Sequence, residues 1–324
     1  MISYRYTTMN YDPLLLTCVG VSHDLPLLPH FIAHYRQLGI APGRFRVLLN
    51  STDPQDPGLA KAHAILEEAG IAHVEEWIAP YTSGSMWEAR RELQSRHARA
   101  DDWVLSADVD EFQEYPDPLP DFLAECDAMG VTAVQGVLID RLAAGGRLAP
   151  VEAAPFLLDQ FPIQADVTWS IAGRGEHHDI FGMMKLMAMH GDVLPSRGGH
   201  HPQQGRPVSY LYGVALGHFA ELETSEGRFR VPTRVHHVHW TDTLPERLER
   251  RLATPGVSPA GAEYGQKQLD HFAVNEGVAL EQVPIRTHNG DGAGAPSWQE
   301  EVDRLRRKSR SLKLRNIVRR IVGR

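Results

Sequence analysis

The chain has 324 residues, of which 42% are hydrophobic and 23% are charged, and this is the composition of a globular protein. Its length suits one large α/β domain or two small domains. A disordered chain, a collagen-like repeat and a coiled coil are excluded as global descriptions, and no apolar run is long enough to span a membrane.

Charge divides the chain into two unequal parts. The net charge is −8, but residues 301–324 carry ten Lys or Arg against two acidic residues, which leaves −16 on residues 1–300. A body with this charge repels nucleic acid. The first twelve residues lack the features of a signal peptide, and Cys18 and Cys126 lie far apart in the sequence. These features predict a reduced, cytoplasmic protein that does not bind nucleic acid.

The first 107 residues alternate between short apolar runs and amphipathic segments. The predicted strands are residues 14–19, 45–49, 73–78 and 102–107, and the predicted helices are residues 24–39, 57–69 and 85–98. On the last of these helices, Arg90 and Arg91 are expected to face solvent. Helices of this length between strands imply right-handed crossovers and a largely parallel sheet. Ligands of such sheets bind at the carboxyl ends of the strands.

Beyond residue 115 the pattern loosens. The predicted elements are a helix at 119–129, strands at 132–139, 183–189 and 234–240, and a helix at 244–252. The stretch 141–232 is rich in Gly, Pro and His, as are both substrate-binding loops and plain connections. We expect a domain at residues 11–283, a Gly-rich linker at 284–300 and a basic amphipathic helix at 301–324.

Two carboxylates follow the fourth predicted strand. Asp108 and Asp110 would repel each other at the mouth of a buried strand unless a cation lies between them. Divalent ions such as Mg²⁺ or Mn²⁺ take oxygen ligands and bind substrate phosphates at the same time. Two aspartates one residue apart also occur in solvated loops, but the position directly after a strand favours a metal site for a nucleotide-diphosphate substrate.

The late strand supplies candidate imidazole ligands. Because side chains alternate along a strand, His237 and His239 share one face with Val235, while His236 and Val238 share the other. One imidazole from the first face would complete the metal site. The alternative is that these histidines are half-buried strand residues with local hydrogen bonds.

The order of these motifs resembles a known family. The run PHFIAHYRQLGI at 29–40, the strand and loop at 45–53, DWV at 102–104 and DVDEF at 108–112 are similar to family 2-type glycosyltransferases of the GT-A fold. The chain is most similar to the branch with a D-x-D-E-F signature, which includes the family 92 enzymes. The resemblance covers residues 14–115. It resumes at 181–185 and 237–240, where that branch has a lysine-containing strand and a histidine before a helix.

The resemblance implies a single GT-A-like α/β domain with a mostly parallel central sheet flanked by helices. It also implies transfer of a sugar from a nucleotide-diphosphate donor, most often a UDP-sugar, with Mn²⁺ or Mg²⁺ on the diphosphate. Asp108 and Asp110 would be the carboxylates at the metal and donor phosphates, and His239 the later metal ligand. Asp53 would lie near the base or ribose. Relatives have Asn-Glu after the first strand, so the corresponding nucleotide contact falls to the shorter carboxylate of Asp24.

Glycosyl transfer requires a neutralised leaving diphosphate and a base that deprotonates the acceptor hydroxyl. For an inverting transferase, Asp179 ranks ahead of Glu176 as the base, although such clusters are also ordinary solvated loops. Lys185 and Arg197 are candidates for contacts with phosphates or acceptor anions, with a solvated position as the alternative.

Trp169 and Trp240 are candidates for a sugar-stacking platform, with core packing as the alternative. We expect a saccharide or lipid-linked acceptor in surface polysaccharide biosynthesis. In the tail, Leu314, Ile317, Val318 and Ile321 lie on one helical face with basic residues around them. Such a helix can bind an anionic membrane surface and hold a cytoplasmic enzyme at the inner face of the membrane. The alternative is a helix packed on its own domain or on a partner subunit.

Two other classes of function remain open. A metal-dependent phosphohydrolase would use the DVD motif with the histidines of the chain, namely His177, His178, His237 and His239. It would hydrolyse phosphate esters without a sugar acceptor. A non-catalytic nucleotide-sugar binding module is the other alternative, and the intact pair of aspartates argues against it.

Overall fold

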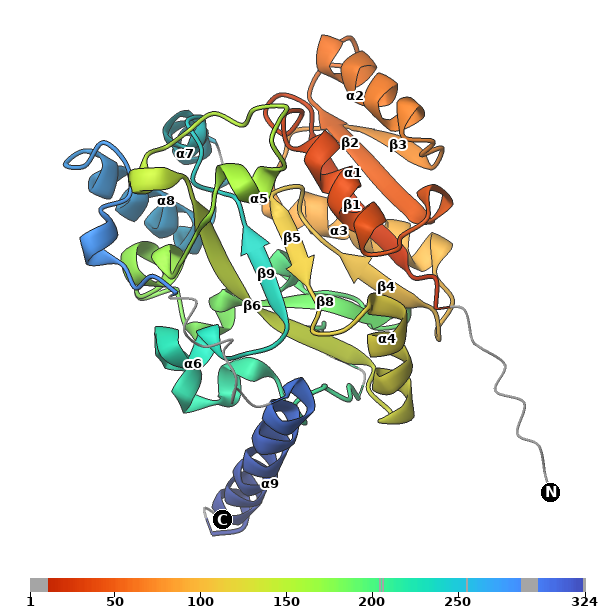
Figure 1. The fold of residues 1–324 in the computed structure, drawn as a ribbon, viewed down its shortest axis with the longest axis vertical. Coiled ribbons are helices and arrows are strands. Elements are labelled where there is room, and N and C mark those ends of the chain that lie inside the picture. Colours follow the sequence, from red (N-terminus) through yellow and green to blue (C-terminus); the bar gives the residue numbers. More distant parts are fainter. Residues whose placement is uncertain (1–10, 204, 206, 255, 287–296, 323–324) are drawn as a thin grey trace.

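The computed structural model describes residues 11–203, 205, 207–254, 256–286 and 297–322, with side chains described up to residue 312. The strands are β1 (Leu14–Gly20), β2 (Phe45–Ser51), β3 (Val74–Ile78), β4 (Trp103–Ser106), β5 (Glu111–Glu114), β6 (Ala133–Leu142), β7 (Ile163–Ala165), β8 (Met184–His190) and β9 (Arg234–His237). The α-helices are α1 (Leu28–Gln37), α2 (Pro57–Glu68), α3 (Ser83–His97), α4 (Leu119–Ala128), α5 (Leu157–Gln160), α6 (Ser225–Phe229), α7 (Leu244–Ala253), α8 (Pro259–Phe272) and α9 (Trp298–Val322). These strands form one sheet in the order β3-β2-β1-β4-β8-β6-β9-β5, with β7 paired to β6 (Figure 1).

The first four strands in sequence form a parallel sheet, in which β1, β2 and β4 are buried on both faces and the edge strand β3 is partly exposed. In β1, Leu15 and Val19 pack in the core cluster that contains α1 and α2. Leu14, Leu16 and Cys18 pack in the cluster that contains α3. Helices therefore cover both faces, as the continuous apolar run of a buried parallel strand requires.

The later strands make the rest of the sheet mixed. β8 joins β4 in antiparallel orientation, β6 pairs with β8 antiparallel and with β9 parallel, and β5 closes the edge antiparallel to β9. The predicted fold class, a single α/β domain whose sheet is flanked by helices, is confirmed. Three parallel pairs lie within the first 106 residues and a fourth joins β6 to β9, whereas each antiparallel pair of the described strands includes a strand that follows residue 110.

A short connection forces this sheet to curl. β4 and β5 are separated in the sheet by three other strands, which would place them about 19 Å apart if the sheet were flat. Only four residues, 107–110, join them, and part of that connection is a turn in which Glu111 N donates to Asp108 O at 2.9 Å. The edge strand β5 must therefore return towards β4. Gln113 Nε2 bridges the two sides by donating to Ser106 O at 3.0 Å and Met187 O at 3.2 Å.

Several predicted elements differ in extent from those of the structure. α1 begins at Leu28 and not at residue 24, because the backbone carbonyl of Asp24 accepts from Leu27 N and Leu28 N in a turn while its carboxylate accepts from Gly20 N. β9 ends at His237 and not at residue 240. Helix α8 was not predicted, because its sequence is rich in Gly, Ala and Gln and lacks a clear apolar period.

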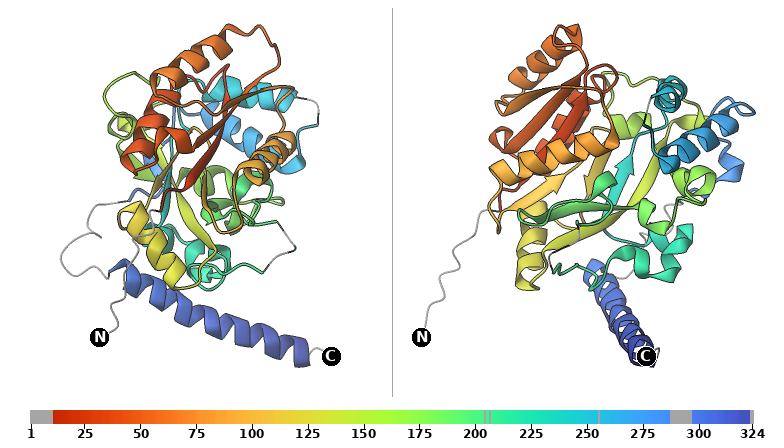
Figure 2. Two further views of the ribbon diagram at one scale, coloured as in Figure 1. Left: turned by 90° about the vertical axis from the view of Figure 1, so that its right-hand side faces the viewer. Right: turned by 180° about the vertical axis from the view of Figure 1, so that it is seen from behind.

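Helix α9 packs on the domain through its first turns. Trp298 Nε1 donates to Asp117 Oδ2 at 2.6 Å, and Val302 and Leu305 are buried. Figure 2 shows the far end of α9 extending beyond the body of the domain. The apolar side chains on which the predicted membrane contact depends, and residues 287–296 of the predicted linker, lie outside the described residues. Within the described part of the chain, no helix combines the length and the apolar character needed to cross a membrane.

The packing of the core can be tested at Phe112. Its ring is fully buried on β5, 6.4 Å from Phe31 and 6.5 Å from Phe156 between ring centroids. We expect Phe112→Ala to lower the free energy of unfolding by about 3–5 kcal/mol, because it leaves a cavity in a packed core. Val274→Ala, at a side chain that is 82% exposed, is the control and should change it by less than about 0.5 kcal/mol. Urea denaturation measures both, and similar values would contradict the packing described here.

Glu114 makes the stability of the β5–β9 edge depend on pH. Burial opposes its ionisation, but His236 at 2.7 Å and Arg234 at 2.9 Å outweigh burial and lower its pKa from 4.5 to about 2. The folded state therefore binds this proton less tightly than the unfolded state, so the stabilisation is lost as the pH falls from about 4.5 to 2. In chemical denaturation at several pH values, Glu114→Gln should lose stability less steeply over this range than the wild type. If the two proteins lose stability equally with falling pH, the lowered pKa of Glu114 is wrong.

Candidate functional site

A large cavity opens at the carboxyl ends of the parallel strands. Its volume is about 1450 Å³. One wall comes from the ends of β1 and β2, including Asp24 and Asn50, and the opposite wall comes from α7, α8 and the stretch 173–183. Asp108, Asp110 and the carboxylate of Glu111 lie between these walls, as expected for ligand binding in an open α/β sheet.

Asp108 is held by two cations from different elements. Its carboxylate lies 3.0 Å from Arg90 Nη1 on α3 and 3.4 Å from Lys185 Nζ on β8. Burial opposes ionisation, but Lys185 and Arg90 outweigh it and lower the pKa of Asp108. Lys185 also lies 2.7 Å from Glu111. Burial would lower the pKa of this lysine, but Glu111 and Asp108 outweigh burial and raise it, so the ammonium stays charged.

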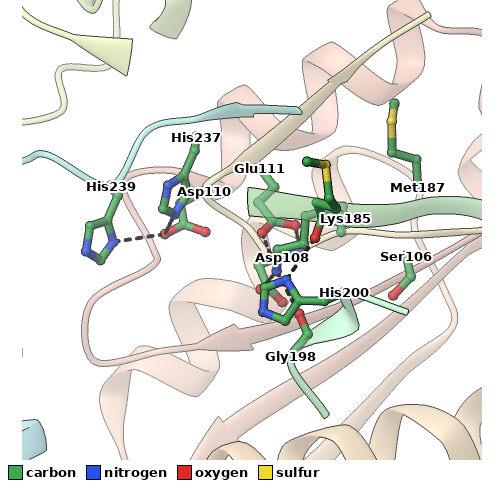
Figure 3. Close-up of polar contacts among 12 residues, drawn as sticks. Ser106, Asp108, Asp110, Glu111, Lys185, Met187, Gly198, His200, His237 and His239 are labelled. Atoms are coloured by element: carbon green, nitrogen blue, oxygen red, sulfur yellow. Dashed lines mark hydrogen bonds and ion pairs between the residues drawn. The ribbon is translucent and has the colours of Figure 1, made fainter. Parts of the chain in front are cut away.

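Asp110 faces two imidazoles (Figure 3). Its Oδ2 lies 3.7 Å from His237 Nε2 and 3.7 Å from His239 Nδ1, and Arg247 on α7 is 3.8 Å away. The two imidazole rings stack with centroids 4.9 Å apart. His239 lies beyond the end of β9, yet it keeps the side that strand alternation predicts, while His236 turns to Glu114.

The orientation of His237 is fixed by a buried carboxylate. Asp140 on β6 is fully buried and accepts from Val167 N, Thr168 N, Thr168 Oγ1 and Trp240 Nε1. His237 Nδ1 lies 3.2 Å from the same carboxylate. A carboxylate behind an imidazole of this kind sets which ring nitrogen carries the proton and leaves the other free to bind a metal.

These residues fit a divalent cation. One ligand atom each from Asp110, His237 and His239 lie within 4.8 Å of one another. His239 is buried and its Nε2 has no hydrogen-bond partner, and burial lowers its pKa to about 4, so the imidazole is neutral. Neutral imidazoles and a carboxylate are metal ligands. Asp108, Asp110 and Glu111 form a second group within the same distance, but Arg90 and Lys185 already compensate two of its members.

The two predicted general bases lie in different positions. Asp179 lines the cavity as an exposed residue, and its carboxylate accepts from Phe181 N at 3.0 Å at the start of a 3₁₀ turn. Glu176 is exposed and is not among the described residues that line the cavity. Arg197 does line it.

The two predicted nucleotide contacts also differ. Asp24 lines the cavity, and its carboxylate accepts from Gly20 N at 2.8 Å at the end of β1. Asp53 does not line it in the described part of the chain, and its carboxylate accepts from Gln55 N in an exposed turn. At this strand end, Asn50, Ser51 and Asp56 take part in the cavity wall instead. Asn50 Nδ2 donates to Trp77 O and Ala79 O, which fixes the loop that follows β3.

Three expectations need correction. Arg90 does not face solvent, because it is 1% exposed and donates to Ala107 O in addition to its ion pair with Asp108. Lys185, the candidate phosphate contact, lines the cavity, and its alternative of a solvated edge position is wrong, because β8 lies between β4 and β6. Trp240 is fully buried and bonded to Asp140, and Trp169 is buried beneath two guanidinium groups, so neither is available to stack on a sugar.

The roles of Asp140 beside His237 and of Arg247 beside Asp110 were not predicted from the sequence. Asp140 ends an apolar run in β6, and a carboxylate at a fully buried strand position is a signal that could have been used. Arg247 had no such signal, because its place beside Asp110 depends on how α7 packs.

Comparison with known proteins does not assign the chain to a family. No protein-family model matches it, and no curated protein is similar to it. Among solved structures, TarS of S. aureus, residues 1–349, is 11% identical over 82% of this chain and 72% of that one, with a TM-score of 0.31. Its complex with UDP is 10% identical over the same shares, with a TM-score of 0.33. The mannose-1-phosphate geranyltransferase of Thermus thermophilus is 16% identical over 48% of each chain, with a TM-score of 0.24. These values are too low to support a function, which has to be argued from the site.

Arg90 and its neighbour Arg91 provide a matched test of the site. Arg90→Met leaves Asp108 and Ala107 O without their buried partner, so we expect the free energy of unfolding to fall by about 3 kcal/mol. Arg91 makes one hydrogen bond, to Pro195 O at 3.3 Å, and Arg91→Met should cost less than about 1 kcal/mol. Denaturant titration compares the two, and equal losses would argue against a buried Arg90–Asp108 pair.

Proposed function

We propose that this protein is a metal-dependent glycosyltransferase that moves a sugar from a nucleotide-diphosphate donor, with UDP as the nucleotide, to a saccharide or glycoconjugate acceptor. The observation that carries the proposal is the group Asp110, His237 and His239 in the cavity at the carboxyl edge of the sheet. Two imidazoles in this group favour Mn²⁺ over Mg²⁺, because Mg²⁺ prefers oxygen ligands.

Different residues of the site would bind the cation, orient its ligands and face the diphosphate of the donor. Asp110, His237 and His239 would hold the cation, which when bound neutralises charge on the donor diphosphate. Asp140 keeps His237 in the orientation that turns Nε2 towards Asp110. Lys185 and Arg90 hold Asp108 in place, and Arg247 adds positive charge beside Asp110 where the diphosphate would leave.

The transfer step needs a base for the acceptor. The bond between the sugar C1 and the donor phosphate oxygen breaks, with the electron pair leaving on the nucleoside diphosphate, and C1 bonds to the acceptor oxygen. The hydroxyl proton passes to a carboxylate, and Asp179 is our candidate for an inverting reaction because it lines the cavity and forms no ion pair among the described residues. Asp179 is preferred to Glu176 as the base because it lines the cavity.

The phosphohydrolase alternative has less support. It requires His177 and His178 to act with the aspartates, but His178 Nε2 bonds to Ala260 O, and neither histidine belongs to a metal-ligand group of the described residues. A binding module without catalysis needs no pair of imidazoles beside a carboxylate. Synthesis of a surface polysaccharide, at the inner face of the membrane, is part of the proposal as the biological setting.

Calorimetric titration with UDP tests the proposal. With Mn²⁺ present we expect binding that excess chelator abolishes, because the diphosphate then loses its cation. Asp110→Asn and His239→Gln should each weaken Mn²⁺-dependent UDP binding at least tenfold. Asp101→Asn, at an exposed position outside the cavity, is the charge-matched control and should bind as the wild type does.

Two outcomes would exclude the proposal. UDP binding that is unaffected by chelator would show that the donor site does not depend on a metal ion. Release of inorganic phosphate from simple phosphate esters, together with no UDP binding, would favour the phosphohydrolase. If UDP binds as expected, turnover with a panel of UDP-sugars identifies the donor.

A further inference from the structure

Helix α7 presents a row of arginines to the cavity. Arg247, Arg250 and Arg251 all line it. Arg250 and Arg251 follow Arg247 by three and four residues, so each of them neighbours Arg247 on the surface of the helix. A guanidinium group offers a planar set of donors that fits phosphate oxygens.

These arginines carry more positive charge than their neighbours compensate. Arg247 lies 3.8 Å from Asp110, and Arg250 lies 3.1 Å from Glu246 in an exposed pair that contributes little. No ion pair of Arg251 with a carboxylate is found among the described residues. The far end of the row therefore has charge available for an anionic ligand.

Helix α7 and the strand ends expected to hold the nucleotide belong to different parts of the fold. α7 follows β9, which is separated from β1 in the sheet by β4, β8 and β6. Figures 1 and 2 show α7 and α8 on one side of the molecule and β1, β2 and β3 on the other. Asp110, beside Arg247, lies between the two. Arg250 and Arg251 are one helical turn further along α7, about 5 Å along its axis.

We propose that Arg250 and Arg251 bind a phosphate group on the acceptor, so that the acceptor is a phosphate-bearing saccharide. The inference rests on the proposed function. The diphosphate of the donor would lie at Asp110 and Arg247, and the phosphate of the acceptor one helical turn away. Two long guanidinium side chains that line the same cavity can both contact the oxygens of one phosphate, whereas a neutral sugar leaves them without an anion.

The test compares three small probes on one protein. Full-length protein saturated with Mn²⁺ and UDP is titrated calorimetrically with glucose 6-phosphate, glucuronate and glucose. We expect glucose 6-phosphate to bind at least tenfold more tightly than the other two. Arg250→Gln with Arg251→Gln should reduce this binding at least tenfold and change the affinity for UDP by less than twofold. Arg36→Gln, an exposed arginine of α1 outside the cavity, is the control.

Each other outcome is decisive. An equal loss of UDP affinity in the double variant would assign the two arginines to the donor and overturn the inference. Equal binding of glucuronate would overturn the phosphate preference. If UDP binds with Mn²⁺ but glucose 6-phosphate binds no better than glucose, the inference fails and the proposed function stands. If UDP does not bind, the proposed function fails, and the inference fails with it because it rests on that function. Thermal unfolding of the double variant verifies that it is folded.

Discussion

The four-residue connection between β4 and β5 is the constraint on which the site depends. Since these strands are not neighbours in the sheet, the connection can be made only if the sheet curls and returns its β5 edge towards β4. Asp108 and Asp110 lie within the connection. The curl brings them to Lys185 of β8 on one side and to His237 of β9 on the other. A flat sheet with the same strands would leave the aspartates without these partners.

Charge compensation explains how three acidic side chains can lie together at this point. Glu111 is buried, and burial raises its pKa, with Asp108 and Asp110 adding to the effect. Lys185 and Arg90 compensate two negative charges from inside the protein, and both come from elements outside the acidic motif. Asp110 differs, because it lies 3.7 Å from two imidazoles, one of them shared with Asp140, and 3.8 Å from Arg247. With Asp108 and Glu111 paired to Arg90 and Lys185, the group that fits a cation best is Asp110, His237 and His239.

The carboxylate behind His237 also connects the site to the core. Asp140 accepts hydrogen bonds from the backbone of Val167 and Thr168 and from the indole of Trp240, all of them buried. The position of the imidazole thus depends on how the strand β6, the segment after β7 and the residue after His239 pack together. A buried charge with this many donors is stable only as part of the complete fold.

The sequence predicts the α/β class, the parallel strands of the first half and the acidic motif at a strand end. These follow from local patterns, namely apolar runs, helical periods and the alternation that put His237 and His239 on one side. It did not determine the burial of Arg90, the role of Asp140, the helix α8 or the place of Arg247 beside Asp110. Those depend on contacts between residues 18 to 137 positions apart in the chain. These features follow from the curled sheet. An arginine or aspartate has the same local sequence pattern whether it faces solvent or pairs with a charge from a distant part of the chain.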